Sequence, residues 1–260
     1  MAEKVIVTFY GHSCIGIDFT NYSILIDPFI TGNLVAKVKP EDLHPNLIMV
    51  THAHKDHFGD TLQIATANKS LVLSSPEIAD YCQARNVQAQ GIYHDETFKP
   101  QNTNIIIKSV KAVHNSIFED GSYGGSACGY SVRTDILQLY HPGDTSFFDG
   151  MQALTDKIEI IFLPIGDEYI MNFEEIISTI KTIKPKIVVP VHYSAIAEQT
   201  LNPDEFVKLV TSQTGTEVLV MNPGDKIEFP RDAKTQTQAQ KPGASQLLGG
   251  YYNLNDLFNG

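Results

Sequence analysis

Four side chains that can bind a metal ion lie within six consecutive residues of this sequence. They are His52, His54, Asp56 and His57, in the segment Thr-His-Ala-His-Lys-Asp-His-Phe-Gly-Asp at residues 51–60. Histidine and aspartate are poor core fillers, and crowding ionisable groups into one loop costs hydration and adds repulsion unless something compensates them. A divalent cation is the simplest compensation, because imidazole nitrogens and carboxylate oxygens are common zinc ligands. The spacing therefore predicts a metal site.

The composition limits the classes of function that such a site can serve. The chain has 260 residues, 42% of them hydrophobic, which is enough for one large core. Its formal net charge of -11 argues against nonspecific binding to nucleic acid or anionic membranes. No stretch has the length of a membrane span or the pattern of a secretory signal, so we expect a cytoplasmic protein. The three cysteines, Cys14, Cys82 and Cys128, are widely spaced among apolar neighbours and are predicted to be buried thiols.

Strands and helices that could position the loop are predicted from periodicity and β-branched content. The first series comprises strands at residues 5–10, 14–19, 23–26, 46–50 and 71–74, with helices at 61–67 and 77–85. The second comprises strands at residues 104–112, 128–133, 136–140, 158–164, 186–191, 217–221 and 226–229, with helices at 173–183 and 203–210. Two meander-like halves, each followed by helices, predict two sheets packed face to face with helices outside.

The composition changes at about residue 231, where Gln, Thr, Ala, Lys and Gly become dominant. Such a segment cannot bury enough apolar surface to order itself. We therefore predict one domain at residues 1–230, followed by a flexible linker and C-terminal tail at residues 231–260.

The spacing His-x-His-x-Asp-His resembles the signature of the metallo-β-lactamase superfamily. Four further motifs carry the resemblance: Leu-Ile-Asp-Pro-Phe around Asp27, Ala-Val-His-Asn-Ser around His114, His-Pro-Gly-Asp-Thr around Asp144 and Pro-Val-His-Tyr around His192. Gly-His-Ser around His12 and Leu-Pro-Ile-Gly at residues 163–166 are similar to a branch of small bacterial and archaeal metal-dependent hydrolases related to L-ascorbate-6-phosphate lactonase. The resemblance covers about residues 4–230. It implies an α/β (α+β) fold, the four-layer αβ/βα sandwich with two mixed sheets face to face and helices outside.

Carried over position by position, the resemblance implies two divalent metal ions. The first would be held by His52, His54 and His114, and the second by Asp56, His57 and His192, with Asp144 bridging both. Three imidazoles suit a tetrahedral zinc with one open position, whereas a carboxylate with imidazoles suits zinc, manganese or iron. We expect Zn2+ first, with Mn2+ and Fe2+ as alternatives. Taken singly, the three downstream residues would be ordinary core, surface or turn residues.

His12 is a candidate catalytic residue, together with Asp56 and Asp144. A histidine directly after a strand would lie near the same sheet edge, where it could contact substrate or donate a proton. The alternative is a histidine that only supports another ligand through a hydrogen bond. His44, His94 and His141 lack a supporting pattern, and we predict them to be surface or loop residues.

Two metal ions about 3.5–4 Å apart lower the pKa of bound water toward ~7 and polarise the oxygen that it attacks. The sequence has no nucleophile elbow, Walker loop or dinucleotide fingerprint. We therefore predict a hydrolase in which a hydroxide between the metals attacks a small-molecule ester, lactone or phosphorylated substrate. A homo-oligomer is compatible with the resemblance, since relatives often assemble; no nucleic acid or membrane partner is expected.

Three other functions compete with this prediction. A phosphodiesterase or nuclease would use the same loop, but the acidic composition and the lack of a basic arm argue against it. A non-catalytic structural metal site would need only four ligands that leave no open coordination position, whereas this sequence offers seven ligands distributed along the chain. An oxygen-reducing diiron protein of the superfamily usually has glutamate where His54 stands.

Overall fold

The computed structural model describes residues 4–155, 157–165, 170–193 and 203–231 of the chain. Apart from its first residue, the predicted linker and tail lie outside the described residues. Among the helices of the described part, none has both the length and the apolar character that crossing a membrane requires.

The first sheet has seven strands in the order β14-β1-β2-β3-β4-β5-β6. Their bounds are β1 (Val5–Gly11), β2 (Cys14–Asp18), β3 (Ser23–Ile26), β4 (Leu47–Met49), β5 (Leu71–Ser74), β6 (Ala89–Gly91) and β14 (Lys226–Phe229). Strands β14 to β3 pair antiparallel, and β3 to β6 pair parallel. The parallel part needs crossover connections, which the helices after β4 and β5 supply.

The second sheet also has seven strands, in the order β13-β12-β11-β10-β9-β8-β7. Their bounds are β7 (Thr97–Phe98), β8 (Ile106–Lys111), β9 (Cys128–Arg133), β10 (Gln138–His141), β11 (Ile160–Pro164), β12 (Ile187–Val191) and β13 (Glu217–Val218). Strands β7 to β10 pair antiparallel, and β10 to β13 pair parallel. Both sheets are therefore mixed, as predicted.

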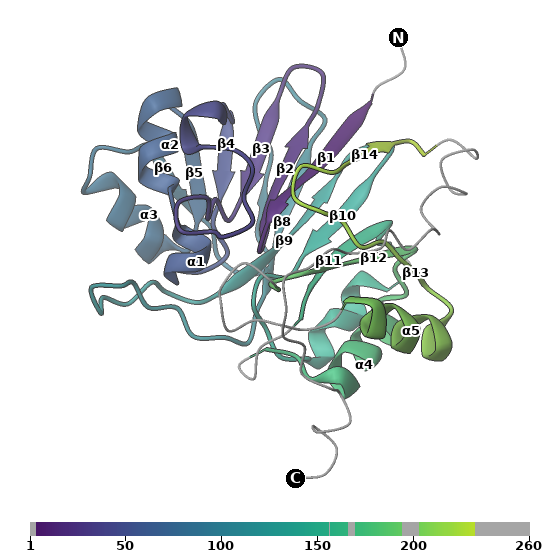
Figure 1. Ribbon diagram of the computed structural model, residues 1–260. Helices are drawn as coiled ribbons and strands as arrows, with labels where there is room; N and C mark the ends of the chain where they lie inside the picture. Colours follow the sequence, from purple (N-terminus) through teal and green to yellow (C-terminus); the bar gives the residue numbers. More distant parts are fainter. Residues whose placement is uncertain (1–3, 156, 166–169, 194–202, 232–260) are drawn as a thin grey trace.

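Helices cover the outer face of each sheet, which completes four layers (Figure 1). The helices are α1 (Lys55–Phe58), α2 (Thr61–Asn68), α3 (Pro76–Gln83), α4 (Phe173–Ile183) and α5 (Pro203–Thr214), with 3-10 helices η1 (Pro40–Asp42) and η2 (Asp149–Leu154). On β3, Ile24 and Ile26 enter the core between the sheets, whereas Leu25 packs into the core shared with α2 and α3. This alternation is expected where both faces of a strand are buried. The predicted four-layer sandwich is confirmed.

The largest differences from prediction concern short elements. Helix α1 lies inside the predicted metal loop, and the edge strands β6 and β7 were not predicted. Elements of two to four residues carry too few side chains for periodicity to show. Helix α5 continues to Thr214 rather than residue 210, because its hydrogen bonds continue after the apolar pattern stops. Strand β13 ends at Val218 rather than residue 221.

Candidate metal centre

The predicted ligands all follow the carboxyl ends of strands, and these ends meet at one edge of the sandwich. Strand β4 precedes the histidine loop, β8 precedes His114, β10 precedes Asp144 and β12 precedes His192. The structure gathers donor atoms from all four segments into groups in which every atom lies within 4.8 Å of the others. The predicted convergence of strand ends is confirmed, and it includes all seven predicted ligands.

Two glycines allow the chain to fold this closely. Gly59 ends α1 with a φ of +40°, and a Cβ there would lie 2.4 Å from the Pro28 carbonyl oxygen. Gly143 has a φ of +62°, and a Cβ there would lie 2.7 Å from Cβ of Thr51. A side chain at Gly143 would therefore separate the turn that carries Asp144 from the histidine loop.

The first triad consists of His52, His54 and His114. Nδ1 of His54 lies 2.9 Å from Nε2 of His52 and 3.3 Å from Nε2 of His114. His52 is fully buried, and the other two rings are half-buried. Three imidazole nitrogens converge on one point, which is the geometry that a tetrahedral cation with one open position requires.

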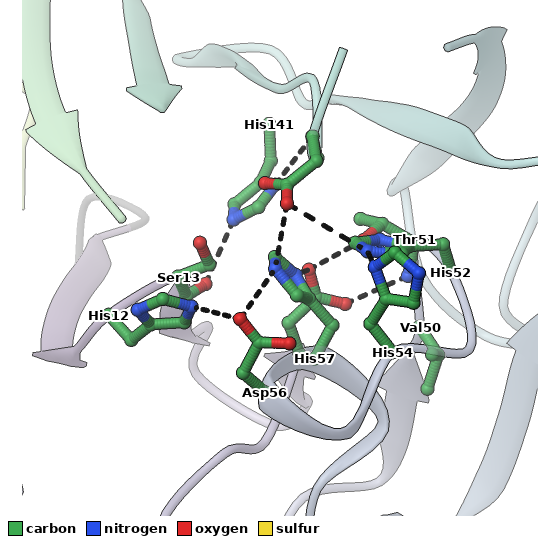
Figure 2. Close-up of polar contacts among 12 residues, drawn as sticks. His12, Ser13, Val50, Thr51, His52, His54, Asp56, His57 and His141 are labelled. Atoms are coloured by element: carbon green, nitrogen blue, oxygen red, sulfur yellow. Dashed lines mark hydrogen bonds and ion pairs between the residues drawn. The ribbon is translucent and has the colours of Figure 1, made fainter. Parts of the chain in front are cut away.

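Asp27 orients His52 of the first triad and also His57, which belongs to the second triad described below. The Thr51 hydroxyl donates to Oδ2 of Asp27 at 2.7 Å, so its oxygen accepts from Nδ1 of His52 at 3.0 Å. Nδ1 of His57 donates to the same Oδ2 at 2.8 Å. Nε2 of the neutral His52 therefore presents a lone pair toward the centre. Burial lowers the pKa of His57, but the carboxylates of Asp144, Asp27 and Asp56 outweigh it and raise that pKa, so its Nε2 presents a lone pair only once a metal displaces the proton. Figure 2 shows this arrangement around Thr51, His52 and His57.

The second triad consists of Asp56, His57 and His192, and Asp144 lies between the two triads. Oδ2 of Asp144 is 3.1 Å from Nε2 of His192 and 3.3 Å from Nε2 of His57. The same oxygen is 3.8 Å from Nε2 of His114 and 3.9 Å from Nε2 of His52. Oδ1 of Asp144 is buried and has no hydrogen-bond partner among the described residues. A buried carboxylate that faces imidazoles from both triads fits a bridging ligand.

The electrostatics of the two triads differ. Burial lowers the pKa of His52 well below its ordinary value and also lowers the pKa of His114. Burial acts the same way on His192, but the Asp144 carboxylate outweighs it and raises the pKa of His192 to about 9. Burial opposes ionisation of Asp144, yet His192 and His57 hold the pKa of that carboxyl well below its usual range. Without metal, the second triad therefore keeps its charge balance with protons.

These pKa shifts predict a pH dependence of metal binding. A metal ion at the second triad must displace the proton from His192, so its apparent affinity should rise from pH 7 to pH 9 by about tenfold per pH unit for each proton displaced. The first triad should bind with nearly constant affinity over that range, because His52 and His114 have already lost their protons. Competition with a chelator at pH 7, 8 and 9 measures both constants. Two pH-independent affinities would contradict this assignment.

His12 lies against the second triad and is fully buried. Its Nε2 is 2.9 Å from Oδ2 of Asp56 (Figure 2). Burial, together with the charge of His192, lowers the pKa of His12 to about 4. At neutral pH the imidazole is therefore uncharged, which does not favour the predicted role of His12 as a proton donor.

His12 also has a left-handed backbone with a φ of 54°, as do Asp27 and His192 with φ of 47° and 65°. Such conformations are costly for residues other than glycine and concentrate at functional sites.

The prediction for His141 was wrong. This histidine is buried at the end of β10, where its Nε2 lies 2.9 Å from the carbonyl oxygen of Ser13 and its Nδ1 accepts from the backbone N–H of Gly143. It joins the turn that carries His12 to the turn that carries Asp144. The sequence gives no signal for this role, because the Ser13 contact spans 128 positions along the chain.

The other predicted histidines and the cysteines lie outside the donor groups. His44 is exposed, as predicted, and His94 is half-buried with Nε2 2.9 Å from the Ala127 carbonyl oxygen. All three cysteines are buried thiols, as predicted. Thr51 is a site residue that sequence reasoning missed, although its place directly before the His-x-His motif is a signal.

Comparison with known proteins decides the family. The domain family described as "Beta-lactamase superfamily domain" matches residues 6–192, which is more than half of the chain. The chain belongs to the β-lactamase superfamily. The match extends from Ile6 in β1 to His192, so it contains all seven predicted ligands.

Superfamily relatives place the chain among the metal-dependent hydrolases. A protein named UPF0173 metal-dependent hydrolase from Enterococcus faecalis is 40% identical over 227 residues, 84% of this chain and 97% of that protein. A protein of the same name from Methanosarcina mazei is 34% identical over 228 residues, 86% of this chain and 98% of that protein. Among solved structures, the metallo hydrolase Igni18 from Ignicoccus hospitalis has a TM-score of 0.79 and 31% identity, and the match covers 88% of this chain and 100% of that one.

Proposed function

We propose that the chain is a dinuclear metal-dependent hydrolase that acts on small-molecule esters or lactones. The observation that carries the proposal is the position of Asp144, whose Oδ2 lies within 3.9 Å of imidazole nitrogens from both triads. A single metal site would not need one buried carboxylate between two separate sets of donors. Two ions, one at each set of donors, would both need the negative charge of this carboxylate.

The donor set fits two divalent cations. The first triad offers three nitrogens, which suits zinc, and the second offers one carboxylate and two imidazoles, which suits zinc, manganese or iron. When bound, two such ions supply an activated water and a Lewis-acid contact to the oxygen of the scissile group. In this proposal His52, His54 and His114 would hold the first ion, Asp56, His57 and His192 would hold the second, and Asp144 would serve both.

The residues of the chain then orient these donors and balance their charge. Asp27 keeps the lone pairs of His52 and His57 directed inward. Asp144 and Asp56 together supply two negative charges next to two dications, so the loaded site keeps a positive charge that favours an anionic transition state. Asp56 also faces the side of the centre where Nε2 of His57 and His192 lie, at 3.9 and 3.7 Å. It is therefore placed to orient the attacking water.

The surroundings favour a neutral carbonyl substrate over a phosphorylated one. Lys55, the cation of the histidine loop, is exposed and forms an ion pair with Glu119 at 2.7 Å, as expected of a side chain turned away from the metals. Exposed apolar side chains lie instead on the segment that carries His114; Val113 and Ile117 are 41% and 46% exposed. An apolar acyl or lactone ring would gain from contact with them, whereas a phosphate would find no partner in Lys55.

Metal analysis and a substrate panel test the proposal. The purified chain should bind two metal ions after reconstitution and hydrolyse p-nitrophenyl butyrate or γ-butyrolactone derivatives faster than p-nitrophenyl phosphate or bis-p-nitrophenyl phosphate. Faster phosphodiester cleavage would instead identify a phosphodiesterase. Fewer than one metal per chain would refute the dinuclear site, and two metals without turnover of any substrate would support a metal-binding protein without catalysis.

A further inference from the structure

His12 belongs to the largest group of metal-binding donors among the described residues. One donor atom each from His12, Asp56, His57 and His192 lies within 4.8 Å of all the others. The other two groups contain three residues each. The metal division that the superfamily resemblance implies leaves His12 out, so the geometry contains a donor that this division does not use.

We propose that His12 is a direct ligand of the second metal position, through Nε2. Together with the shared Asp144, the second position then has five protein donors, whereas the first has four. The two positions therefore differ in coordination number. This inference rests on the proposed dinuclear function, but its tests measure metal binding rather than hydrolysis.

The distances agree with a crowded coordination sphere. Donors held about 2.0–2.1 Å from an ion lie about 2.9 Å apart as neighbours on an octahedron and about 3.3 Å apart on a tetrahedron. Nε2 of His12 lies 2.9 Å from Oδ2 of Asp56, and Nε2 of His192 lies 3.1 Å from Oδ2 of Asp144. The first separation equals the octahedral value, and the second lies between the octahedral and tetrahedral values. Nε2 of His57 and of His192 lie farther from Oδ2 of Asp56, at 3.9 and 3.7 Å. A position with five or six ligands suits Mn2+ or Fe2+ better than a four-coordinate zinc site does.

The surroundings immobilise the His12 ring, as a ligand requires. Its ring centroid lies 4.1 Å from that of His192, 5.4 Å from that of His57 and 5.6 Å from that of Phe29. The backbone N–H of His192 donates to the His12 carbonyl at 2.9 Å, which ties the two turns together. Full burial between two predicted ligands holds a metal ligand in place. It gives no advantage to a side chain that must reach a substrate.

The competing role is a hydrogen bond that only positions Asp56. Nδ1 of His12 is buried without a hydrogen-bond partner in the described part of the chain, so nothing else fixes which nitrogen carries the proton. Nε2–H can therefore donate to Asp56 without metal, and the proton can move to Nδ1 when Nε2 binds an ion. Both roles are consistent with the same metal-free contact, and only metal binding separates them.

Two substitutions separate a ligand from a positioning residue. His12→Gln keeps an N–H that can donate to Asp56 but removes the imidazole ligand, and His12→Ala removes both. If His12 is a ligand, both variants should weaken Mn2+ binding at the second position by about 100-fold or more. The affinity of the first position, measured while the second position is empty, should stay within about threefold of the unchanged protein. His44→Gln is the matched control, because it removes an exposed imidazole. Wild-type affinity in His12→Gln would overturn the inference.

A second measurement needs no change at His12. In a His54→Ala background the first triad is disabled, and one Mn2+ should bind at the second position. Pulsed EPR of that ion should detect three coordinated nitrogens, from His12, His57 and His192. Two nitrogens would overturn the inference even if a His12 variant failed to fold. Three nitrogens in a protein that hydrolyses none of the panel substrates would sustain the inference while the proposed function failed.

Discussion

Asp144→Ala should lower kcat for the best ester or lactone substrate by at least about 10³-fold, the largest effect expected of any single substitution. The change removes the carboxylate oxygen that faces imidazoles from both triads. Without it, two dications near each other lose the negative charge between them, so at least one should bind too weakly to be retained. Steady-state kinetics and metal content of the same preparation check this result.

The matched control for this variant is Asp120→Ala. Asp120 is an exposed aspartate whose carboxylate accepts from the backbone N–H and the hydroxyl of Ser122, and it belongs to none of the three donor groups of the described residues. It should keep kcat within about twofold of the unchanged protein, as surface substitutions usually do. Excess zinc or manganese should not restore Asp144→Ala, because the missing group is itself a ligand. Turnover close to that of the unchanged protein would remove Asp144 from the bridging role.

Asp27→Asn should lower metal affinity at both positions by about 10–100-fold without removing any ligand. The asparagine carbonyl can still accept from the Thr51 backbone N–H, but its NH2 would then face the Thr51 hydroxyl and Nδ1 of His57. His57 would then have to accept there and carry its proton on Nε2, which blocks the lone pair that points to the centre. The dissociation constants from chelator competition give the direct measurement.

Excess metal separates this variant from Asp144→Ala. Asp27 acts only through the imidazoles that it orients, so saturating zinc should restore most of the turnover of Asp27→Asn. Asp60→Asn is the control, because Asp60 is a nearby buried carboxylate that accepts from the backbone N–H groups of Ile30 and Thr31. An Asp60 variant with the same loss of metal affinity would show that the effect reflects general disturbance of the loop.

The fold and the donor set could be predicted to different depths. Among the strands that precede the predicted ligands, β12 is apolar and buried on both faces, and β8 runs over six residues, so their pattern was readable and their ends could be assigned. Asp27 was identified through a motif that carries the resemblance, and its bonds to Thr51 and His57 show how it supports the histidine loop. Local pattern and the resemblance together were sufficient here.

Contacts between distant turns could not be predicted in the same way. His12 and Asp56 are 44 positions apart, and the burial of His141 depends on a carbonyl 128 positions away. Neither contact leaves a trace in local periodicity, because it depends on how the two sheets pack rather than on spacing along one element. The role of Thr51 was missed for a related reason. A hydroxyl that links a carboxylate to an imidazole produces no recognisable pattern in the sequence.

The shared carboxylate of Asp27 has a further consequence for how the centre fills. It binds His57 directly and His52 through the Thr51 hydroxyl, so one side chain orients donors of both metal positions. An ion at either position orders this common network, and the second ion then meets donors that are already fixed. Loading should accordingly be cooperative, and by thermodynamic reciprocity each ion should strengthen the other by the same factor. In a cell where the metal is scarce, molecules would then be mostly empty or fully loaded, and few would carry a single ion.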